Sequence, residues 1–204
     1  SKKPHKELLA LSRAIIQPLL PHFHKGQSGR IAIVGGCEDY TGAPIFAAHS
    51  AALLGCDLSH IVCEKSAATV IKLYLPDLMV HPYLLDTNGL KSTANDQESL
   101  IDSKKELDGA TKQQIQTSVL PKIAALLERM NVVVVGSGFG RDPAMVYTLR
   151  LIIEQIKVLN IPVILDADAL YLVSKDPLII SNYKKAVKIG RATSELQSRG
   201  LISY

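Results

Sequence analysis

The sequence is poor in the residues that build disulfide scaffolds and metal centres. Its 204 residues include only three cysteines, Cys37, Cys56 and Cys63, an odd number without the spacing of a metal-binding or redox pair. We therefore expect free thiols in the core of a protein from a reducing compartment, the cytoplasm. The six histidines show no metal-ligand spacing with the cysteines or the acidic residues, so none is assigned to a metal.

Long apolar runs and clustered basic residues are also missing. No apolar run approaches the roughly 20 residues that a membrane-spanning helix needs, so we expect no membrane partner. The net charge is only +4, and the lysines and arginines are scattered, with no basic helix interleaved with aromatic residues. This distribution argues against nucleic acid and favours a small anionic molecule as the partner. The sequence leaves homo-oligomerisation open.

What is present is the composition of one globular domain. Hydrophobic residues make up 47% of the chain and charged residues 21%, enough to bury a sizeable core. Residues 6–20 have the apolar spacing of a helix, which Glu7 and Arg13 interrupt too early for a secretory signal. We expect a first surface helix that packs on the domain, and an amphipathic mitochondrial presequence is the alternative.

Strand-like apolar runs alternate with helical patterns along the chain, which indicates an α/β fold with a mostly parallel sheet and helices on both faces. Helices are expected over 43–54, where Gly55 follows the helix end, and over 143–159. The segment 86–118 is polar, shows almost no apolar periodicity and is expected as a surface insertion outside the sheet. The expected strands are 30–34, 59–63, 78–81, 132–135, 163–165 and 186–189.

The first candidate site follows the strand at 30–34, in the run Val34-Gly-Gly-Cys-Glu-Asp-Tyr-Thr-Gly-Ala-Pro44. Its glycines permit close approach of the backbone to a ligand. Thr41 is the expected cap of the helix that follows, and the amides at the start of this helix favour an anion. A nucleotide-like group fits such a turn. The alternative is a tight connection in which the glycines serve geometry alone, with Glu38 and Asp39 as ordinary surface acids.

The second candidate site is the turn Gly136-Ser-Gly-Phe-Gly140, followed by Arg141 and by Asp142 as the expected helix cap. It is neither a Walker A loop nor a full dinucleotide fingerprint. Arg141 is informative, because a guanidinium beside free backbone amides binds phosphate or carboxylate through two hydrogen bonds. The alternative for Arg141 is a solvated side chain at a helix entrance.

The third candidate site is the pair Asp166 and Asp168, at the carboxyl end of the strand at 163–165. Alternate residues of an extended segment point the same way, so the two carboxylates would suit magnesium, a water network or ligand hydroxyls. The alternative is that Asp168 caps a helix over 169–173 and Asp166 anchors a loop.

These motifs together resemble one family. The run His24-Lys-Gly-Gln-Ser-Gly29, the two glycine turns and Leu165-Asp-Ala-Asp-Ala-Leu170 occur in the same order in the ATP-dependent NAD(P)H-hydrate dehydratases of eukaryotic, fungal type. The resemblance covers about residues 8–189 and implies a ribokinase-like fold. It also implies that hydrated NADH or NADPH, in its S form, is dehydrated back to NADH or NADPH, with ATP converted to ADP and phosphate.

The resemblance also implies the ligands and the residues that bind them. ATP and Mg²⁺ are the expected cofactors, and magnesium would offset charge during phosphoryl transfer. Gly138 would contact the hydrated cofactor. Gly136, Gly140 and Arg141 would shape its turn, and Asp39, Tyr40 and Thr41 would line the substrate side.

The chain departs from the family after Ile189. The family continues with a Thr-Pro-Asn-x-x-Glu-Phe segment and a Gly-x-Gly-Asp helix that supplies the catalytic aspartate and much of the ATP pocket, whereas this chain has a divergent tail at 190–204. We therefore expect a domain over 1–189 that lacks its C-terminal third and has little or no activity alone. The alternatives are a small-molecule kinase of the same fold and an inactive form that only binds nucleotide or a partner.

Overall fold

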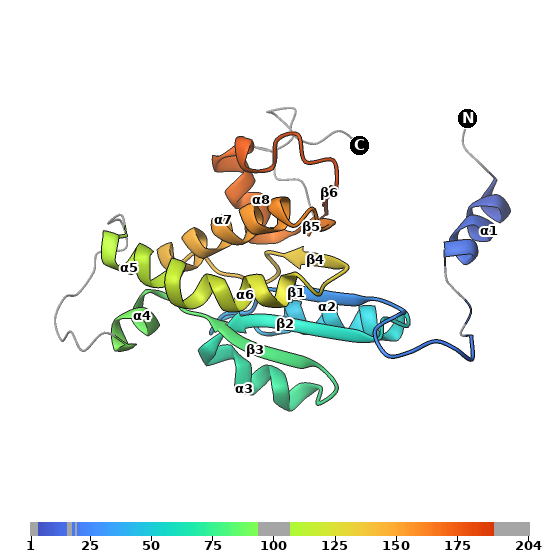
Figure 1. The fold of residues 1–204 in the computed structure, drawn as a ribbon, viewed down its shortest axis with the longest axis horizontal. Helices are drawn as coiled ribbons and strands as arrows, with labels where there is room; N and C mark the ends of the chain where they lie inside the picture. The colour runs from blue at the N-terminus through green and yellow to red at the C-terminus, as the bar shows by residue number, and fades with distance from the viewer. Residues whose placement is uncertain (1–3, 16–17, 19, 94–106, 190–204) are drawn as a thin grey trace.

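The computed structural model describes residues 4–15, 18, 20–93 and 107–189, and its centre is one parallel sheet (Figure 1). Six strands lie in the order β3-β2-β1-β4-β5-β6, and every neighbouring pair is parallel. All six lie where the sequence predicted strands, so the α/β fold with a parallel sheet is confirmed. The strands are β1 Arg30–Val34, β2 Leu58–Glu64, β3 Met79–Leu84, β4 Val132–Val135, β5 Val163–Leu165 and β6 Ala186–Lys188.

The residue types of β4 and β3 suit the positions that these strands take in the sheet. The four valines of β4 are mostly buried, and the strand pairs with β1 on one side and β5 on the other. Branched side chains suit such a central strand, whose two faces are both covered. β3 lies at the edge of the sheet and continues through Pro82, beyond the predicted end at residue 81. An edge strand tolerates proline because one of its sides has no ladder partner.

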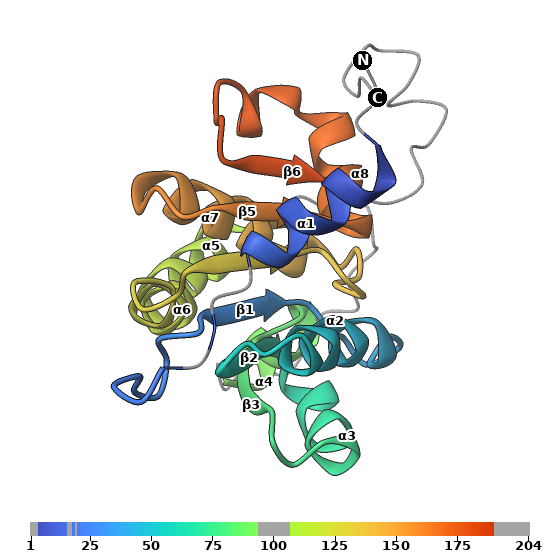
Figure 2. The same cartoon turned by 90° about the vertical axis from the view of Figure 1, so that its right-hand side faces the viewer.

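Helices cover both faces of the sheet (Figure 2). On one face, α2 Gly42–Leu53 and α3 Lys65–Tyr74 pack over a core that contains Ile33 and Ile61. On the other face, α6 Leu120–Leu127, α7 Pro143–Val158 and α8 Ala167–Lys175 pack over a larger core that contains Val34, Val135 and Leu165. The short helix η2 Pro177–Ile180 leads into β6. The helices predicted at 43–54 and 143–159 are confirmed to within one residue, and α8 is longer than the predicted 169–173.

The central strands β1 and β4 mark a reversal in the winding of the sheet. β1 leads into α2 on one face, and its neighbour β4 leads into α7 on the opposite face. The connections therefore diverge at the carboxyl ends of two adjacent strands. Open α/β sheets bind their ligands in the crevice that such a divergence creates.

The described parts of the segment 86–118 lie outside the sheet, as predicted, but they contribute buried residues to the core, which the sequence did not indicate. They form α4 Thr87–Thr93, α5 Gly109–Gln114 and most of the π-helix η1 Ile115–Val119. Leu90 and Ile115 are almost fully buried in the larger core. The prediction of a surface insertion missed these two buried residues, because single apolar residues spaced far apart leave no periodicity to detect. Residues 94–106 lie outside the described residues.

The N-terminal helix α1, His5–Ile15, does not pack on the domain as the sequence led us to expect. It has no buried residue, and Figures 1 and 2 show it in front of one end of the sheet rather than packed on it. Leu8, Leu11 and Ile15 are exposed, so the predicted packing on the domain is absent. Within the described parts of the chain, no helix combines the length and the apolar character needed to cross a bilayer. The predicted tail at 190–204 lies outside the described residues.

Candidate functional site

The two glycine turns predicted from the sequence lie against each other at the carboxyl ends of β1 and β4. The amide of Gly36 donates a hydrogen bond to the carbonyl of Gly138 over 3.1 Å. A Cβ added to Gly35 would lie only 2.1 Å from the carbonyl oxygen of Ser137. The backbones of the two turns are thus too close to leave room for side chains between them. The first and second candidate sites therefore form one continuous surface.

Gly138 is confined by the first turn. Its φ is +59°, and an added Cβ would lie 2.9 Å from the carbonyl oxygen of Tyr40 and 3.0 Å from the Cβ of Tyr40. The structure therefore gives a packing reason for glycine here, independent of any ligand. Gly136 is confined in the same way by the next strand, since an added Cβ would lie 2.0 Å from the carbonyl oxygen of Asp166. Gly140 faces Cys37, whose sulfur would lie 3.2 Å from an added Cβ.

The first turn is held closed by its own backbone. Cys37 and Tyr40 exchange two backbone hydrogen bonds of 3.3 and 3.1 Å, so residues 37–40 form a compact unit. Asp39 and Tyr40 are exposed on it, and Tyr40 exposes 59% of its surface. Thr41 occupies the position before α2 but its side chain makes no capping hydrogen bond, contrary to the expected cap. Of the predicted substrate-side residues 39–41, Tyr40 therefore lies directly against Gly138, and Asp39 and Thr41 flank it in the chain.

Cys37 lies at this edge but is not equipped as a nucleophile. Its side chain is buried, and burial raises the pKa of its thiol above the ordinary value. The thiolate, which is the reactive form of cysteine, is therefore scarce at neutral pH. The expected free thiols in the core are confirmed for Cys37 and Cys63, while Cys56 is half-buried.

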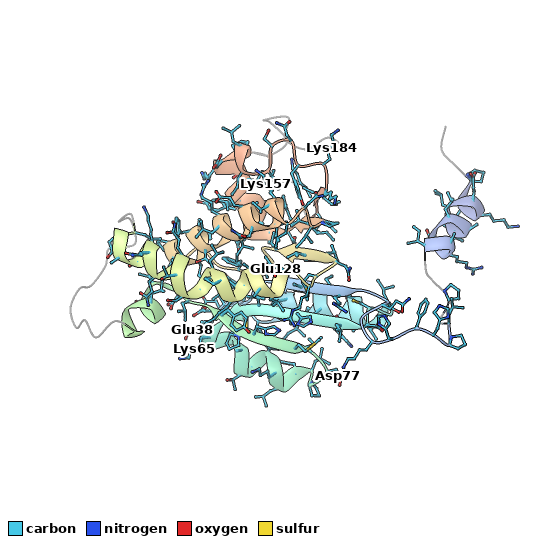
Figure 3. All side chains as sticks on the ribbon, viewed as in Figure 1. Glu38, Lys65, Asp77, Glu128, Lys157 and Lys184 are labelled. Atoms are coloured by element: carbon cyan, nitrogen blue, oxygen red, sulfur yellow. The ribbon has the colours of Figure 1, made fainter. Side chains whose placement is uncertain are left out.

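Glu64 is a residue of this edge that the sequence analysis did not select. It ends β2, is 7% exposed, and accepts a hydrogen bond of 2.9 Å from the amide of Glu38. Its other carboxylate oxygen accepts from the hydroxyl of Ser66, also over 2.9 Å. Figure 3 shows Glu38 and Lys65 together at one end of the strands and Asp77 at the other. The signal in the sequence was an acid at the carboxyl end of a buried strand, the same signal that Asp166 gives.

The aspartates of the third candidate site contact the second turn. Asp166 caps α8 through the amide of Ala167 and accepts a hydrogen bond of 2.8 Å from the hydroxyl of Ser137. Asp168 accepts a hydrogen bond of 3.0 Å from the amide of Gly140. Asp166, rather than Asp168, is the helix cap, which reverses the roles in the alternative reading. The structure thus brings the second and third candidate sites together.

Arg141 lies beside Asp168 at the entrance to this edge. Its Nε donates to the carboxylate of Asp168 over 3.2 Å, and its guanidinium carbon lies 4.2 Å from the centre of the Tyr171 ring. The side chain of Arg141 is still 64% exposed, so the rest of its fork is accessible. A guanidinium held by a carboxylate and an aromatic ring is preorganised for binding an anion.

The next residue, Asp142, fastens the second turn to α7 and to the first residue of α4. It caps α7 through the amides of Ala144 and Met145, as predicted. The same oxygen accepts hydrogen bonds from the amide and the hydroxyl of Thr87, each over 3.0 Å. The second turn is therefore fixed at both of its ends.

The carboxylates of Asp166 and Asp168 do not form a ready-made metal site. Both oxygens of Asp166 and both oxygens of Asp168 accept hydrogen bonds from donors of the protein. Nowhere in the described residues do three or more histidine, cysteine or acidic side chains gather in a group that could hold a metal ion. Contact of this pair with magnesium or a water network remains a prediction.

Comparison with known proteins identifies relatives of the chain. The model of the NAD(P)H-hydrate dehydratase family matches residues 31–189. The chain is 55% identical to the ATP-dependent (S)-NAD(P)H-hydrate dehydratase of Candida albicans over 195 residues, which cover 91% of this chain and 51% of that protein. It is 47% identical to the Saccharomyces cerevisiae protein of the same name over 177 residues, 84% of this chain and 46% of that protein. The chain thus spans about half the length of these relatives.

A solved structure supports the fold. A ribokinase-like superfamily protein from Enterococcus faecalis superimposes with a TM-score of 0.63 at 18% identity, covering 89% of this chain and 51% of that protein. The fold is therefore ribokinase-like, as the resemblance implied. At this identity the similarity concerns the fold alone.

Proposed function

The chain belongs to the NAD(P)H-hydrate dehydratase family, and we propose that it forms the substrate edge of an enzyme that repairs hydrated nicotinamide cofactors. The substrate would be the S form of hydrated NADH or NADPH, and the products NADH or NADPH, ADP and phosphate. The observation that carries this proposal is the direct contact between the turns at 35–41 and 136–141 at the carboxyl ends of β1 and β4. The relatives named above support the choice of substrate.

The chemistry requires a poor leaving group to be replaced by a good one. ATP would transfer a phosphoryl group to the hydroxyl of the hydrate, and phosphate would then leave in place of hydroxide, with ADP as the second product. The described residues of this chain would bind and orient the substrate during these steps. Proximity and orientation alone contribute a large part of the rate in such reactions.

Each part of the edge has a role in that binding. The hydrated cofactor carries phosphates, and the exposed fork of Arg141 offers it charge-assisted hydrogen bonds. Asp39, Tyr40 and Thr41 would line the other side of the substrate. Between the two sides, Gly138 and Gly140 have no side chains and would let the substrate approach the backbone closely. We propose ATP and Mg²⁺ as cofactors. The oxygens of Asp166 and Asp168 accept hydrogen bonds from donors of the protein, so magnesium is given no ligand at this pair.

Two further proposals concern the setting of the enzyme. We place it in the cytoplasm, supported by three cysteines that are all free, with a mitochondrial location as the alternative. Its partners would be small molecules rather than nucleic acid or membranes, supported by the scattered basic residues of a chain with a net charge of +4. A homo-oligomer is compatible with this arrangement.

A substrate panel tests the proposed function. We define the full-length form as residues 1–189 joined to the C-terminal segment that the family resemblance leads us to expect. With ATP and magnesium, this form should convert hydrated NADH and leave sugars and hydroxymethylpyrimidine unphosphorylated. Phosphorylation of one of those small molecules without conversion of the hydrate would instead show a kinase of the same fold. Nucleotide binding without any turnover would indicate a form that only binds.

A further inference from the structure

The carboxylate of Glu64 stands out because it is buried in a place where a charge is expensive. It is 7% exposed, and its hydrogen-bond donors are the backbone amide of Glu38 and the hydroxyl of Ser66. No lysine, arginine or histidine of the described residues forms an ion pair with it. A buried charge without a cationic partner is costly unless its hydrogen bonds compensate. The bond to Glu38 is therefore a strong constraint on the first turn.

This constraint extends to the surface proposed to bind substrate. The amide of Glu64 donates to the carbonyl of Gly36 over 2.9 Å, and its carboxylate accepts from the amide of Glu38. Glu64 therefore holds the turn on both sides of Cys37. Cys37 and Tyr40 close the turn with reciprocal backbone hydrogen bonds. Tyr40 in turn packs against Gly138. A displacement of the amide of Glu38 would therefore shift Tyr40 relative to the second turn.

We propose that Glu64 is a positioning residue for the substrate edge: its buried carboxylate fixes the turn at 37–41 and so sets the distance between Tyr40 and Gly138. Glu64 acts through the turn and does not itself contact the substrate. This inference rests on the proposed function, because it assigns the turn at 37–41 to the substrate.

The chain contains a matched contact at the opposite end of the sheet. Asp57, just before β2, accepts hydrogen bonds of 2.9 Å from the amides of Gly26 and Ser28. It holds a loop before β1 in the way that Glu64 holds a turn after β1. The Asp57 contact lies at the amino ends of the strands, away from both glycine turns. Its removal therefore controls for the general effect of losing a carboxylate that holds a loop.

The test compares Glu64→Ala, Glu64→Gln and Asp57→Ala in the full-length form. For Glu64→Ala we expect the KM for hydrated NADH to rise about tenfold or more, with a smaller change in kcat, because the turn at 37–41 loses its hydrogen bond to a charged group and leaves the geometry that binds substrate. Glu64→Gln keeps an acceptor of the same length and should restore most of the affinity. Asp57→Ala should lower the melting temperature and leave KM unchanged. An unchanged KM in Glu64→Ala, with a melting temperature lowered as in Asp57→Ala, would overturn the proposal.

Hydrogen exchange separates this proposal from the proposed function. In Glu64→Ala, amide exchange should accelerate in peptides that cover 37–41, whereas in Asp57→Ala it should accelerate in peptides that cover 24–29. Unchanged exchange at 37–41 would overturn the role of Glu64 whatever the activity. Accelerated exchange at 37–41 in Glu64→Ala, together with a wild-type full-length form that converts no hydrated NADH, would support the hold of Glu64 on the turn and refute the proposed function.

Discussion

Tyr40 and Gly138, nearly a hundred residues apart in the sequence, meet so closely that a Cβ on Gly138 would lie 2.9 Å from the carbonyl oxygen of Tyr40. The contact joins the turn after β1 to the turn after β4. It means that the shape of the proposed substrate edge depends on both turns at once. A change in either turn should therefore affect the stability of the protein as well as the binding of substrate.

Substitution of Gly138 tests this dependence. Gly138→Ala should lower the free energy of unfolding by more than the roughly 1–3 kcal/mol expected for a left-handed backbone alone, because the added Cβ also meets Tyr40. The matched control is Gly55→Ala, since Gly55 also has a positive φ, +102°, but an added Cβ has no atom within 4 Å. Chemical denaturation measures both. Equal losses in the two variants would show that the contact with Tyr40 contributes nothing.

Arg141 should contribute to affinity rather than to stability. Arg141→Ala removes a charge-assisted hydrogen bond to the substrate, so the dissociation constant of hydrated NADH should rise by the equivalent of about 1.5–3 kcal/mol. Arg141→Lys should not restore it, since lysine lacks the planar fork. Isothermal titration of the full-length form measures this. The control is Arg150, which lies on α7 and pairs with Asp176 after α8, and Arg150→Ala should leave substrate affinity unchanged.

The histidine pair on β2 and β3 predicts an acid-sensitive fold. Nδ1 of His60 and Nε2 of His81 lie 2.9 Å apart, and burial lowers the pKa of His60 to about 4 and also lowers the pKa of His81. Below the unfolded value near 6.5, the unfolded chain binds protons that the folded chain does not. The contribution of this pair to the free energy of unfolding should therefore be constant above pH 6.5 and fall as the pH drops from 6.5 toward 4.

Thermal unfolding across this pH range measures the contribution of the pair. A double variant, His60→Leu with His81→Leu, removes both titrating rings. Between pH 6.5 and 4.5 its melting temperature should fall by less than that of the wild type. The acidic residues titrate in both proteins and cancel in the comparison. Identical slopes would show that the buried pair is not the source of acid sensitivity.

The cysteines should differ in reactivity according to their burial. Burial raises the pKa of Cys63 to about 12 and also raises the pKa of Cys37, so little thiolate forms at either residue at neutral pH. Cys56 is half-buried. Iodoacetamide at neutral pH should therefore modify Cys56 first, as peptide mass spectrometry would show. Faster labelling of Cys63 would contradict the packing around β2.

The sequence predicted the strands well because each is a short apolar run that a parallel sheet covers on both faces. It also selected the turns at 35–41 and 136–141, since glycines followed by a helix start are visible locally, and the structure brings these turns into contact. Their role in binding stays a prediction. It did not predict the hydrogen bond from Glu38 to Glu64, because a local pattern does not show which acid meets which amide. Leu90 and Ile115 were missed for a similar reason, since isolated buried residues leave no periodic signal.

The roles of the two aspartates show the same limit. The sequence placed Asp166 and Asp168 together at the end of β5 and left their roles open. The structure shows that Asp166 caps α8 and that Asp168 accepts from Gly140 and Arg141, contacts made across two strands. Such contacts follow from strand order, which the sequence does not state.

Above all, we propose that the turns at 35–41 and 136–141 together bind the hydrated cofactor. A crystal structure of the full-length form with hydrated NADH and without ATP tests it most directly. The claim predicts substrate density against the backbone of Gly138, with Tyr40 on one side and the guanidinium of Arg141 within hydrogen-bond distance of a phosphate. Ordered substrate bound elsewhere on the protein, with both turns free of it, would contradict the claim.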